Sequence, residues 1–260
     1  MEFITSRTNP RVIGVGKLRD KKYRDISGEF ILDGKKLFLE AIRCGVVLTG
    51  IYVTEEFLEK NREILKKYDV IAVSDGVFAK MSAENAPEGI ICTAKYIDFL
   101  HKFATIYNID PADRSFFAAY EIRDPGNLGT IIRTANAFGI DRLLLSGCAD
   151  IYNPKTVRAA MGGLFRQKIT VCSDLCGTVS ALRQNGTAVY AAALDRDAVR
   201  LDALPESGNF CFAVGNEGHG LPQEIIAQCD GTVFIPMAEN TESLNAAAAA
   251  AVLMWHGRHI

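Results

Sequence analysis

Apolar and polar positions alternate with two different periods along the first part of the chain. Between residues 30 and 96, short apolar runs with strand character are separated by segments whose apolar residues recur at helical spacing. The expected strands are 30–34, 48–54, 69–74 and 89–96, and the expected helices are 35–45, 55–68 and 76–82. This order predicts a small α/β domain.

The alternation restarts more regularly after residue 112. The expected strands are 115–121, 141–147, 168–173, 188–194, 209–215 and 232–237. The expected helices between them are 127–139, 153–165, 175–186 and 221–229. Strands that are apolar throughout and separated by helices indicate a parallel sheet covered on both faces. We therefore expect a basic arm and small domain over 1–100, a linker over 101–112 and a second α/β domain over 113–260.

Composition narrows the class of protein. The 260 residues are 48% hydrophobic and 23% charged, with a formal net charge of −2. These values fit a globular protein and exclude a globally basic nucleic-acid binder, although a local basic face remains open. The N-terminus has no apolar signal core, and the apolar run 246–255 has about half of the roughly 20 residues that span a bilayer. We expect a cytoplasmic protein without a membrane partner.

The cysteines favour a reducing compartment over a disulfide framework. There are seven, an odd number, and their spacing with histidines does not suggest a zinc site, so no metal is expected. Cys172 and Cys176 form a CxxxC pair, which either has a metal or redox role or consists of two small buried apolar residues. The second interpretation is favoured.

Two basic segments are candidates for contact with phosphates. Residues 7–24 carry seven basic residues against one acidic residue, Asp20, and form either a solvated helical face or an RNA-binding arm. The RNA-binding candidates in this arm are Arg7, Arg11, Lys21, Lys22 and Arg24. The second segment contains Lys155, Arg158, Arg166 and Lys168 without an acidic neighbour.

Three polar loops follow strands of the second domain, where ligands of parallel sheets gather. In the first, Asn127 is expected to cap a helix that carries Arg133 in its first turns. The loop has neither a GxGxxG nor a P-loop pattern, which argues against a conventional dinucleotide-binding dehydrogenase. The second loop contains Glu217 and His219 among three glycines; His219 is either a general base or, more commonly at such a position, a surface turn residue.

The third loop leads into six consecutive alanines, 246–251. Ser243 or a near neighbour is expected to cap this helix. Helix propensity explains why alanine forms a helix, but it does not explain why a core-facing helix lacks larger apolar side chains. We therefore expect close packing along it, with Ala248 or Ala249 on the buried face.

Taken in this order, the three loops resemble the motifs of the SpoU (TrmH) family of RNA 2′-O-ribose methyltransferases in the SPOUT class. The motifs read "DPGNLGTIIRTANAFG", "VGNEGHGL" and "IPM…ESLNAAAAAA", and "FILDGKKLFLEA" is similar to the family's small substrate-binding domain. The resemblance implies an α/β fold: a C-terminal SPOUT-type parallel sheet with a deep trefoil knot, and a smaller N-terminal α/β RNA-binding domain. It also implies a homodimer formed through the knotted domain.

The resemblance implies S-adenosyl-L-methionine as cofactor and methyl transfer to a ribose 2′-hydroxyl, with ribosomal RNA favoured over transfer RNA. A non-catalytic RNA- or ribosome-assembly-binding protein is the alternative from another class. By motif position, the expected catalytic residues are Asn127, Arg133, Glu217, Ser243 and Asn245, and the expected cofactor-binding residues are Gly215, Ile235 and Leu244. The chain departs from the family at Glu239, where many members have glycine, and at Ala246-Ala247, where many have Val-Ser.

Transfer of a methyl group to a ribose hydroxyl requires help at the nucleophile, because this hydroxyl is scarcely ionised at neutral pH. Arginine, with a pKa above about 12, is a poor general base. Arg133 is therefore expected to fix the target phosphate and lower the pKa of the hydroxyl by its positive field. Asn127, Ser243 and Asn245 would hydrogen-bond ribose and cofactor, and Glu217 would orient Arg133 or a neighbouring amide.

Overall fold

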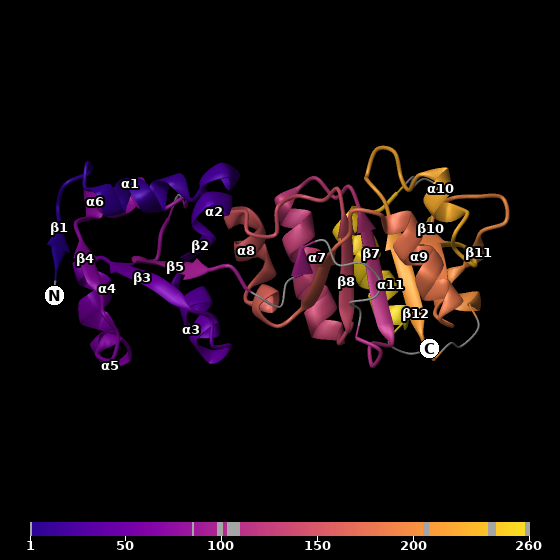
Figure 1. Cartoon of the computed structure of the whole chain (residues 1–260), viewed down its shortest axis with the longest axis horizontal. Coiled ribbons are helices and arrows are strands. Elements are labelled where there is room, and N and C mark those ends of the chain that lie inside the picture. Colours follow the sequence, from indigo (N-terminus) through magenta and orange to yellow (C-terminus); the bar gives the residue numbers. More distant parts are fainter. Residues whose placement is uncertain are drawn as a thin grey trace. The chain divides into compact units, whose positions relative to one another are not determined.

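The chain forms two compact units (Figure 1). The computed structural model of the protein describes residues 2–84, 86–97, 101–102, 110–204, 208–238 and 243–257. Unit 1 consists of Met1–Ile97 and Asp150–Phe165, and unit 2 consists of Asp98–Ala149 and Arg166–Ile260. Most of the expected linker 101–112, like Glu239, lies outside the described residues.

Unit 1 contains a five-stranded mixed sheet in the order β1-β4-β3-β5-β2. Its strands are β1 (Phe3–Ile4), β2 (Glu29–Asp33), β3 (Leu48–Val53), β4 (Ile71–Val73) and β5 (Ile90–Lys95). β1, β4 and β3 pair in parallel, whereas β5 is antiparallel to β3 and β2. The strands that the hydrophobic pattern predicts are confirmed, and β1 is an additional short edge strand.

The helices of unit 1 largely follow the predicted pattern. They are α1 (Pro10–Lys17), α2 (Lys21–Ser27), α3 (Lys35–Arg43), α4 (Glu55–Lys60), α5 (Arg62–Leu65), α6 (Asp75–Met81), α8 (Pro154–Ala160) and the 3-10 turn η2 (Gly163–Phe165). The single helix expected over 55–68 is divided at Asn61, whose side-chain amide donates to the carbonyl of Phe57. Asparagine competes in this way for backbone hydrogen bonds, which favours a helix end.

Residues 150–165 pack with unit 1, although the expected boundary at residue 113 assigns them to the second domain. α8 packs on β2, and Tyr152 stacks on Tyr96 with 4.0 Å between ring centroids. The Tyr152 hydroxyl also accepts a hydrogen bond from the backbone N–H of Ile97 at 2.8 Å. These contacts join segments far apart in the sequence, so the local pattern contains no signal for them.

Unit 2 contains a parallel sheet in the order β11-β13-β10-β12-β7-β8-β9-β6. Its strands are β6 (His101–Lys102), β7 (Ser115–Tyr120), β8 (Arg142–Ser146), β9 (Lys168–Val171), β10 (Ala188–Ala192), β11 (Val199–Arg200), β12 (Phe210–Val214) and β13 (Gly231–Phe234). β7 and β12 pair side by side near the centre although paired residues, such as Ser115 and Phe210, are 95 positions apart. The predicted parallel sheet is confirmed.

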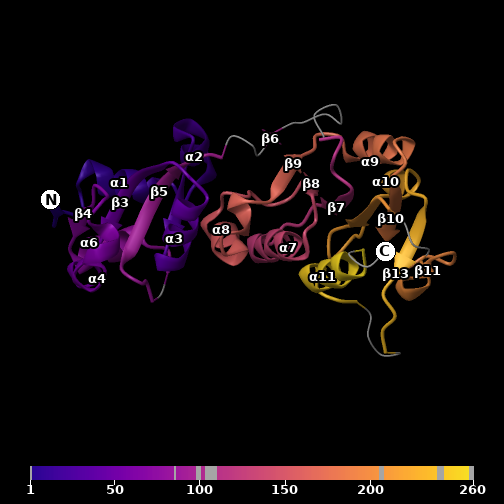
Figure 2. The same cartoon turned by 90° about the horizontal axis from the view of Figure 1, so that it is seen from below.

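Helices cover both faces of this sheet. They are α7 (Pro125–Phe138), α9 (Leu175–Gln184), α10 (Gln223–Ile226), α11 (Ala246–Gly257) and the 3-10 turn η3 (Leu201–Ala203). Figure 2 shows α7 and α11 together on one side of the strands and α9 and α10 on the other. Apolar side chains therefore point to both faces of the central strands, which explains why these strands read as continuous apolar runs.

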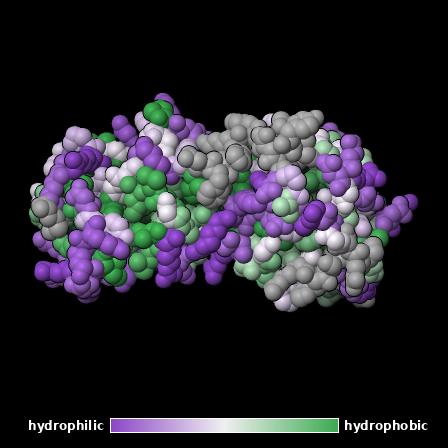
Figure 3. All heavy atoms as spheres, turned by 60° about the horizontal axis from the view of Figure 1, so that its bottom comes forward, coloured by the Kyte–Doolittle hydropathy of each residue, from purple (hydrophilic) through white to green (hydrophobic). Residues whose placement is uncertain are grey.

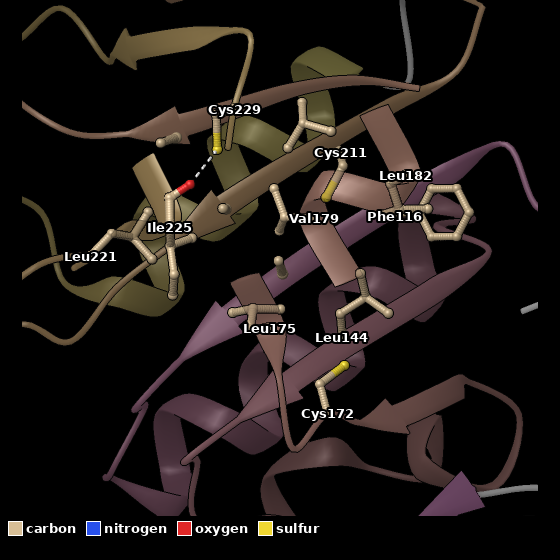
Figure 4. Close-up of a cluster of buried hydrophobic side chains, with 14 residues drawn as sticks. Phe116, Leu144, Cys172, Leu175, Val179, Leu182, Cys211, Leu221, Ile225 and Cys229 are labelled. Carbon is tan, nitrogen blue, oxygen red and sulfur yellow. Dashed lines mark hydrogen bonds between the residues drawn. The ribbon is translucent and has the colours of Figure 1, made fainter. Parts of the chain in front are cut away.

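The core beneath α9 and α10 includes several cysteines (Figure 4). Cys172 and Cys211 point into it among leucine and valine side chains, and burial raises the pKa of the Cys172 thiol to about 11. Cys176 is half-buried and its thiol donates to the carbonyl of Glu224 at 3.4 Å. Buried thiols with raised pKa values behave as small apolar groups. Among the described residues, no cluster of metal-ligating side chains is present.

Charged side chains pair with one another at the amino ends of the unit 2 strands. Arg142 is buried and donates to the carboxylate of Asp113 at 2.7 Å, which also accepts from Lys168 at 2.7 Å. Asp141 accepts from the backbone N–H groups of Arg114 and Ser115. Partial burial tends to raise the pKa of Asp141, but these hydrogen bonds outweigh it and hold the pKa below its usual value. The charged side chains at this edge of the sheet thus neutralise one another.

The face in Figure 3 mixes hydrophilic side chains with small apolar patches on both units. No helix of the described residues combines the length and the apolar character needed to cross a bilayer.

Candidate active site

The first loop at the carboxyl edge of the unit 2 sheet places Asn127 inside a helix rather than at its cap. Asp124 is the N-cap of α7, and its carboxylate accepts a hydrogen bond from the backbone N–H of Asn127 at 2.9 Å. Pro125 follows at the first helical position, where its fixed φ angle is favourable. The expected Asn127 cap is therefore wrong, because the Asp-Pro pair starts the helix three residues earlier. The Asn127 side chain is left free to reach the other loops.

The second loop, residues 215–220, is fixed by Asn216. The Asn216 side chain accepts from the backbone N–H of Gly218 at 2.8 Å and donates to the carbonyl of Glu121 at 3.0 Å. A Cβ atom on Gly215 would lie 2.1 Å from the backbone of Gly220, so only glycine fits there. The loop is thereby held against the end of β7. Pro222 is the N-cap of the following helix, α10.

The third loop ends at the start of α11, which Asn245 caps. Its side-chain oxygen accepts from the backbone N–H of Ala247 at 2.9 Å and of Ala248 at 3.4 Å. The expectation that Ser243 or a near neighbour caps this helix is confirmed with Asn245 as the neighbour. Ser243 itself lies in the wall of a pocket.

Side chains from the three loops form one hydrogen-bonded chain. The Asn127 amide donates to the carboxylate of Glu217 at 2.7 Å, and the Asn245 amide donates to the Asn127 oxygen at 3.1 Å. Because 90 and 118 residues separate the partners, only the fold brings them together. Three residues expected at one site on sequence grounds are therefore in contact.

A pocket of about 400 Å³ opens beside this hydrogen-bonded chain. Its lining includes the apolar residues Val214, Leu221, Ile235 and Leu244, together with Gly215 and Asn216. Glu217, Ser243 and His219 also line it. All three positions expected to bind the cofactor, Gly215, Ile235 and Leu244, thus line the same cavity.

Arg133 lies on a different face of α7 from Asn127. Six residues separate the two positions, which places them about 120° apart around the helix axis. The Arg133 side chain is exposed, and within the described part of the chain it makes no hydrogen bond or ion pair. It does not line the pocket of its own chain. The structure thus groups the other four expected catalytic residues and leaves Arg133 apart from them.

A thiol near the site does not provide a nucleophile. Cys148 follows β8, and its Sγ donates to the carbonyl of Ala119 at 3.3 Å. Burial raises the pKa of Cys148 to about 11, so the group is protonated at neutral pH. The polar side chains that line the pocket carry an amide, a carboxylate, an imidazole and a hydroxyl.

Arg24, expected to bind RNA, is buried and unavailable. Only 1% of the residue is exposed, and its guanidinium donates to the carbonyls of Leu18 and Arg19 and to the carboxylate of Asp150, each at 2.7 Å. A buried arginine requires such partners, because an unpaired charge in the core is costly. The RNA-binding expectation for Arg24 is therefore wrong.

Other expected RNA-binding residues are exposed but already engaged. Arg11 pairs with Glu2 and Lys21 with Asp25, each at 2.5 Å. Three further basic residues also have partners: Arg7 donates to the Gly76 carbonyl, Arg158 pairs with Glu84, and Lys168 pairs with Asp110 and Asp113. Lys155 is exposed on α8. Lys22 lies near the ring of Tyr23, at 5.9 Å from the ring centroid.

Models of known protein families match both parts of the chain. Residues 115–255 match the model of the SpoU rRNA methylase family, and residues 9–92 match an MRM3-like substrate-binding domain. The chain belongs to the SpoU rRNA methylase family. The first match contains the hydrogen-bonded residues and the pocket, and the second lies in unit 1.

Relatives of this SpoU-family chain extend over nearly its whole length. It is 32% identical to the 23S rRNA (guanosine(2553)-2′-O)-methyltransferase RlmP of Bacillus subtilis, over 99% of this chain and 100% of that protein. It is 30% identical to the 23S rRNA (uridine(2479)-2′-O)-methyltransferase of Streptomyces viridochromogenes, over 92% and 85%. The AdoMet-bound rRNA methyltransferase structure from Sinorhizobium meliloti aligns with a TM-score of 0.84 and 28% identity, covering 99% and 97%.

Two residues that organise this SpoU-family site are not among the residues predicted from the sequence. Asp124 caps α7, and the Asp-Pro pair at 124–125 was a readable signal for it. Asn216 fastens the second loop to Glu121, which has a φ angle of 51°, in the left-handed region uncommon for non-glycine residues. No local signal predicts the contact between Asn216 and Glu121, because their proximity depends on the pairing of β12 with β7.

Proposed function

We propose that this protein is an S-adenosylmethionine-dependent RNA 2′-O-ribose methyltransferase that acts on ribosomal RNA. The observation that carries the proposal is the hydrogen-bonded chain Glu217–Asn127–Asn245 beside a pocket lined by Gly215, Ile235 and Leu244. The two 23S rRNA 2′-O-methyltransferases similar to this chain support the reaction and the substrate class.

The residues of the pocket fit S-adenosylmethionine chemically. Apolar side chains such as Leu221 and Leu244 suit an adenine ring, and the glycine backbone at residue 215 admits close approach. The carboxylate of Glu217 and the hydroxyl of Ser243 offer acceptors for polar or positively charged groups. The similar structure from Sinorhizobium meliloti is AdoMet-bound, which supports the assignment.

We assign two roles to the side chains of the site: they orient the bound groups, and they stabilise the negative charge that develops during the reaction. When bound, S-adenosylmethionine supplies an electrophilic methyl group. Asn127 and Asn245 are held rigidly between Glu217 and the start of α11, so they orient the groups that contact them without reorganising. Arg133 would bind the phosphate next to the target ribose and stabilise the developing oxyanion, and a water or phosphate oxygen would take the proton.

The proposal is tested by Arg133→Ala. Loss of the guanidinium is expected to lower methyl transfer to RNA at least about 100-fold, because an electrostatic contact made in the transition state is worth roughly that much. S-adenosylmethionine affinity, measured by calorimetry, should change little. Arg183→Ala, on α9 over the other face of the sheet, is the matched control and should retain parental activity. Near-parental turnover of Arg133→Ala would contradict the assigned role.

The same assay separates the remaining functions. Labelled-methyl transfer to ribosomal RNA but not transfer RNA supports the favoured substrate, and the reverse result supports a transfer RNA enzyme. Binding of RNA without methyl transfer or cofactor binding would support a non-catalytic RNA- or ribosome-assembly-binding protein. We also propose that the protein is cytoplasmic, and fractionation of cells would test this location.

We further propose a homodimer formed through unit 2. Leu244, Val252 and Trp255, on or just before α11, are apolar and 37–50% exposed in the single chain. Arg133 is exposed on α7, which packs beside α11, and is remote from the pocket of its own chain. A dimer through α7 and α11 would cover the apolar side chains and would let Arg133 serve the partner's site.

The C-terminal segment is also proposed to form a trefoil knot. After β13 near one edge of the sheet, the chain returns to α11 on the face opposite α9 and α10. This path is compatible with threading through the loops that form the pocket. Threading predicts slow refolding that slows further when a folded domain is fused to the C-terminus, and a refolding rate unaffected by the fusion would contradict the knot.

A further inference from the structure

The outward face of α1 and α2 in unit 1 has a composition that packing within the chain does not explain. Figure 1 shows the two helices in succession along unit 1. The inward side chains Val12 and Val15 are buried, and α1 packs against α6. The orientation of α1 is therefore fixed: Gly14 and Lys17 face outward, and the half-buried Gly16 lies at the edge of this face.

Gly14 and Gly16 lie inside a helix where alanine would be favoured. Neither has a positive φ angle, and a Cβ atom on either would meet nothing within 4 Å. Glycine inside a helix costs about 0.5–1 kcal/mol relative to alanine. These residues leave bare backbone beside Lys17, where a partner can approach more closely than it could past larger side chains.

Two lysines next to this bare backbone share one aromatic ring. The Nζ atoms of Lys17 and Lys22 lie 5.2 Å and 5.9 Å from the centroid of the Tyr23 ring. Among the residues that the structure describes, neither ammonium group forms an ion pair. The nearby Asp20 caps α2 by accepting from the backbone N–H of Lys22, and Asp25 pairs with Lys21. Two like charges held around one ring are favourable when an anion lies between them.

We propose that Gly14, Gly16, Lys17, Lys22 and Tyr23, the α1–α2 face, bind the sugar-phosphate backbone of the RNA substrate. The two ammonium groups contact phosphates, and the glycines let the RNA chain lie against α1. This inference rests on the proposed function for the identity of the partner. It replaces the wider basic arm, in which Arg24 is buried and Arg11 and Lys21 are paired, with a defined surface.

The first test removes the two charges. The full chain with Lys17→Gln/Lys22→Gln is titrated against an unmodified transcript of large-subunit ribosomal RNA at several salt concentrations. Each phosphate contact contributes about 0.7–0.9 to the slope of log affinity against log salt concentration. Weaker binding is expected, with a slope shallower by about 1.4–1.8. The control Lys60→Gln/Lys66→Gln removes the same charge at α4 and α5 and should bind like the parent.

The second test uses the glycines, whose effects on folding and on binding have opposite signs. Gly14→Ala/Gly16→Ala should raise the melting temperature, because alanine favours the helix. The same variant should bind the transcript several-fold more weakly, because two methyl groups obstruct the approach of the RNA backbone. In methyl transfer, KM for RNA should rise while kcat is retained, which a folding defect would not produce.

The inference is overturned if Lys17→Gln/Lys22→Gln binds RNA with the affinity and salt slope of the parent. It is also overturned if the control pair loses as much affinity, or if the parent does not bind RNA. If the parent methylates RNA and the variants behave like it, the inference fails and the proposed function stands. If binding depends on these residues while the parent transfers no methyl group, the inference stands and the proposed function fails.

Discussion

At the scale of residues, the site depends on a hydrogen-bonded chain whose direction is fixed by its two ends. The carboxylate of Glu217 can only accept, and the backbone N–H of Ala247 can only donate. Between them, each of the two asparagine amides has one possible orientation. This series of hydrogen bonds therefore joins three loops whose motifs are far apart in the sequence.

This polarity predicts a rescue. Asn127→Asp removes the donor toward Glu217 and places two carboxylates in contact, so melting temperature and cofactor affinity should both fall. Adding Glu217→Gln supplies an amide that donates to Asp, while the Asn245 amide still donates to it. The double variant should recover much of the loss, with a coupling energy of about 1–3 kcal/mol in a double-mutant cycle. Additive losses, measured by thermal unfolding and calorimetry, would contradict the proposed polarity.

At the scale of elements, the alanine run is explained by the contacts of α11. This helix packs on both α7 and β12. Ala246, Ala247 and Ala250 are buried, and a Cβ atom on Gly257 would lie 2.4 Å from the Phe210 ring. Ala248, expected as a candidate for the buried face, is exposed, and Ala249 lines the pocket. Small side chains allow the helix to approach the sheet closely.

Two leucine substitutions on α11 should therefore differ. Ala250→Leu inserts a larger group where no surface is exposed and should lower the free energy of unfolding by about 1–3 kcal/mol or more. Ala248→Leu occupies an exposed position and should change the stability of the monomer by less than about 0.5 kcal/mol. Urea unfolding at low protein concentration measures both values. Equal stability of the two variants would show that helix propensity alone accounts for the alanines.

At the scale of the whole molecule, the pocket and its hydrogen-bonded residues belong to unit 2, and the α1–α2 face belongs to unit 1. The pocket is partly open to solvent, and Arg133 does not line it. The complete catalytic arrangement is therefore proposed to need a second copy of the chain.

Charge on the exposed face of α11 should break this dimer. Trp255→Glu is expected to give a monomer by light scattering, because the residue is 50% exposed and next to Phe138 on α7. Methyl transfer should fall as the dimer is lost, and circular dichroism verifies that the variant is folded. Val252→Arg should act likewise, whereas Val47→Glu, in an exposed apolar position of unit 1 outside the α1–α2 face, should not. A fully active monomer would exclude a site completed by the partner.

The sequence by itself determined the alternation of strands and helices, the parallel sheet of unit 2 and the loops that carry the polar residues. These features follow from local periodicity and from turn and capping residues, which act over a few positions. Only the tertiary structure decided that Arg24 is buried, that residues 150–165 pack with unit 1 and that Asn127, Glu217 and Asn245 are in contact. Those outcomes depend on which distant segments pack together, and local pattern does not encode such pairings.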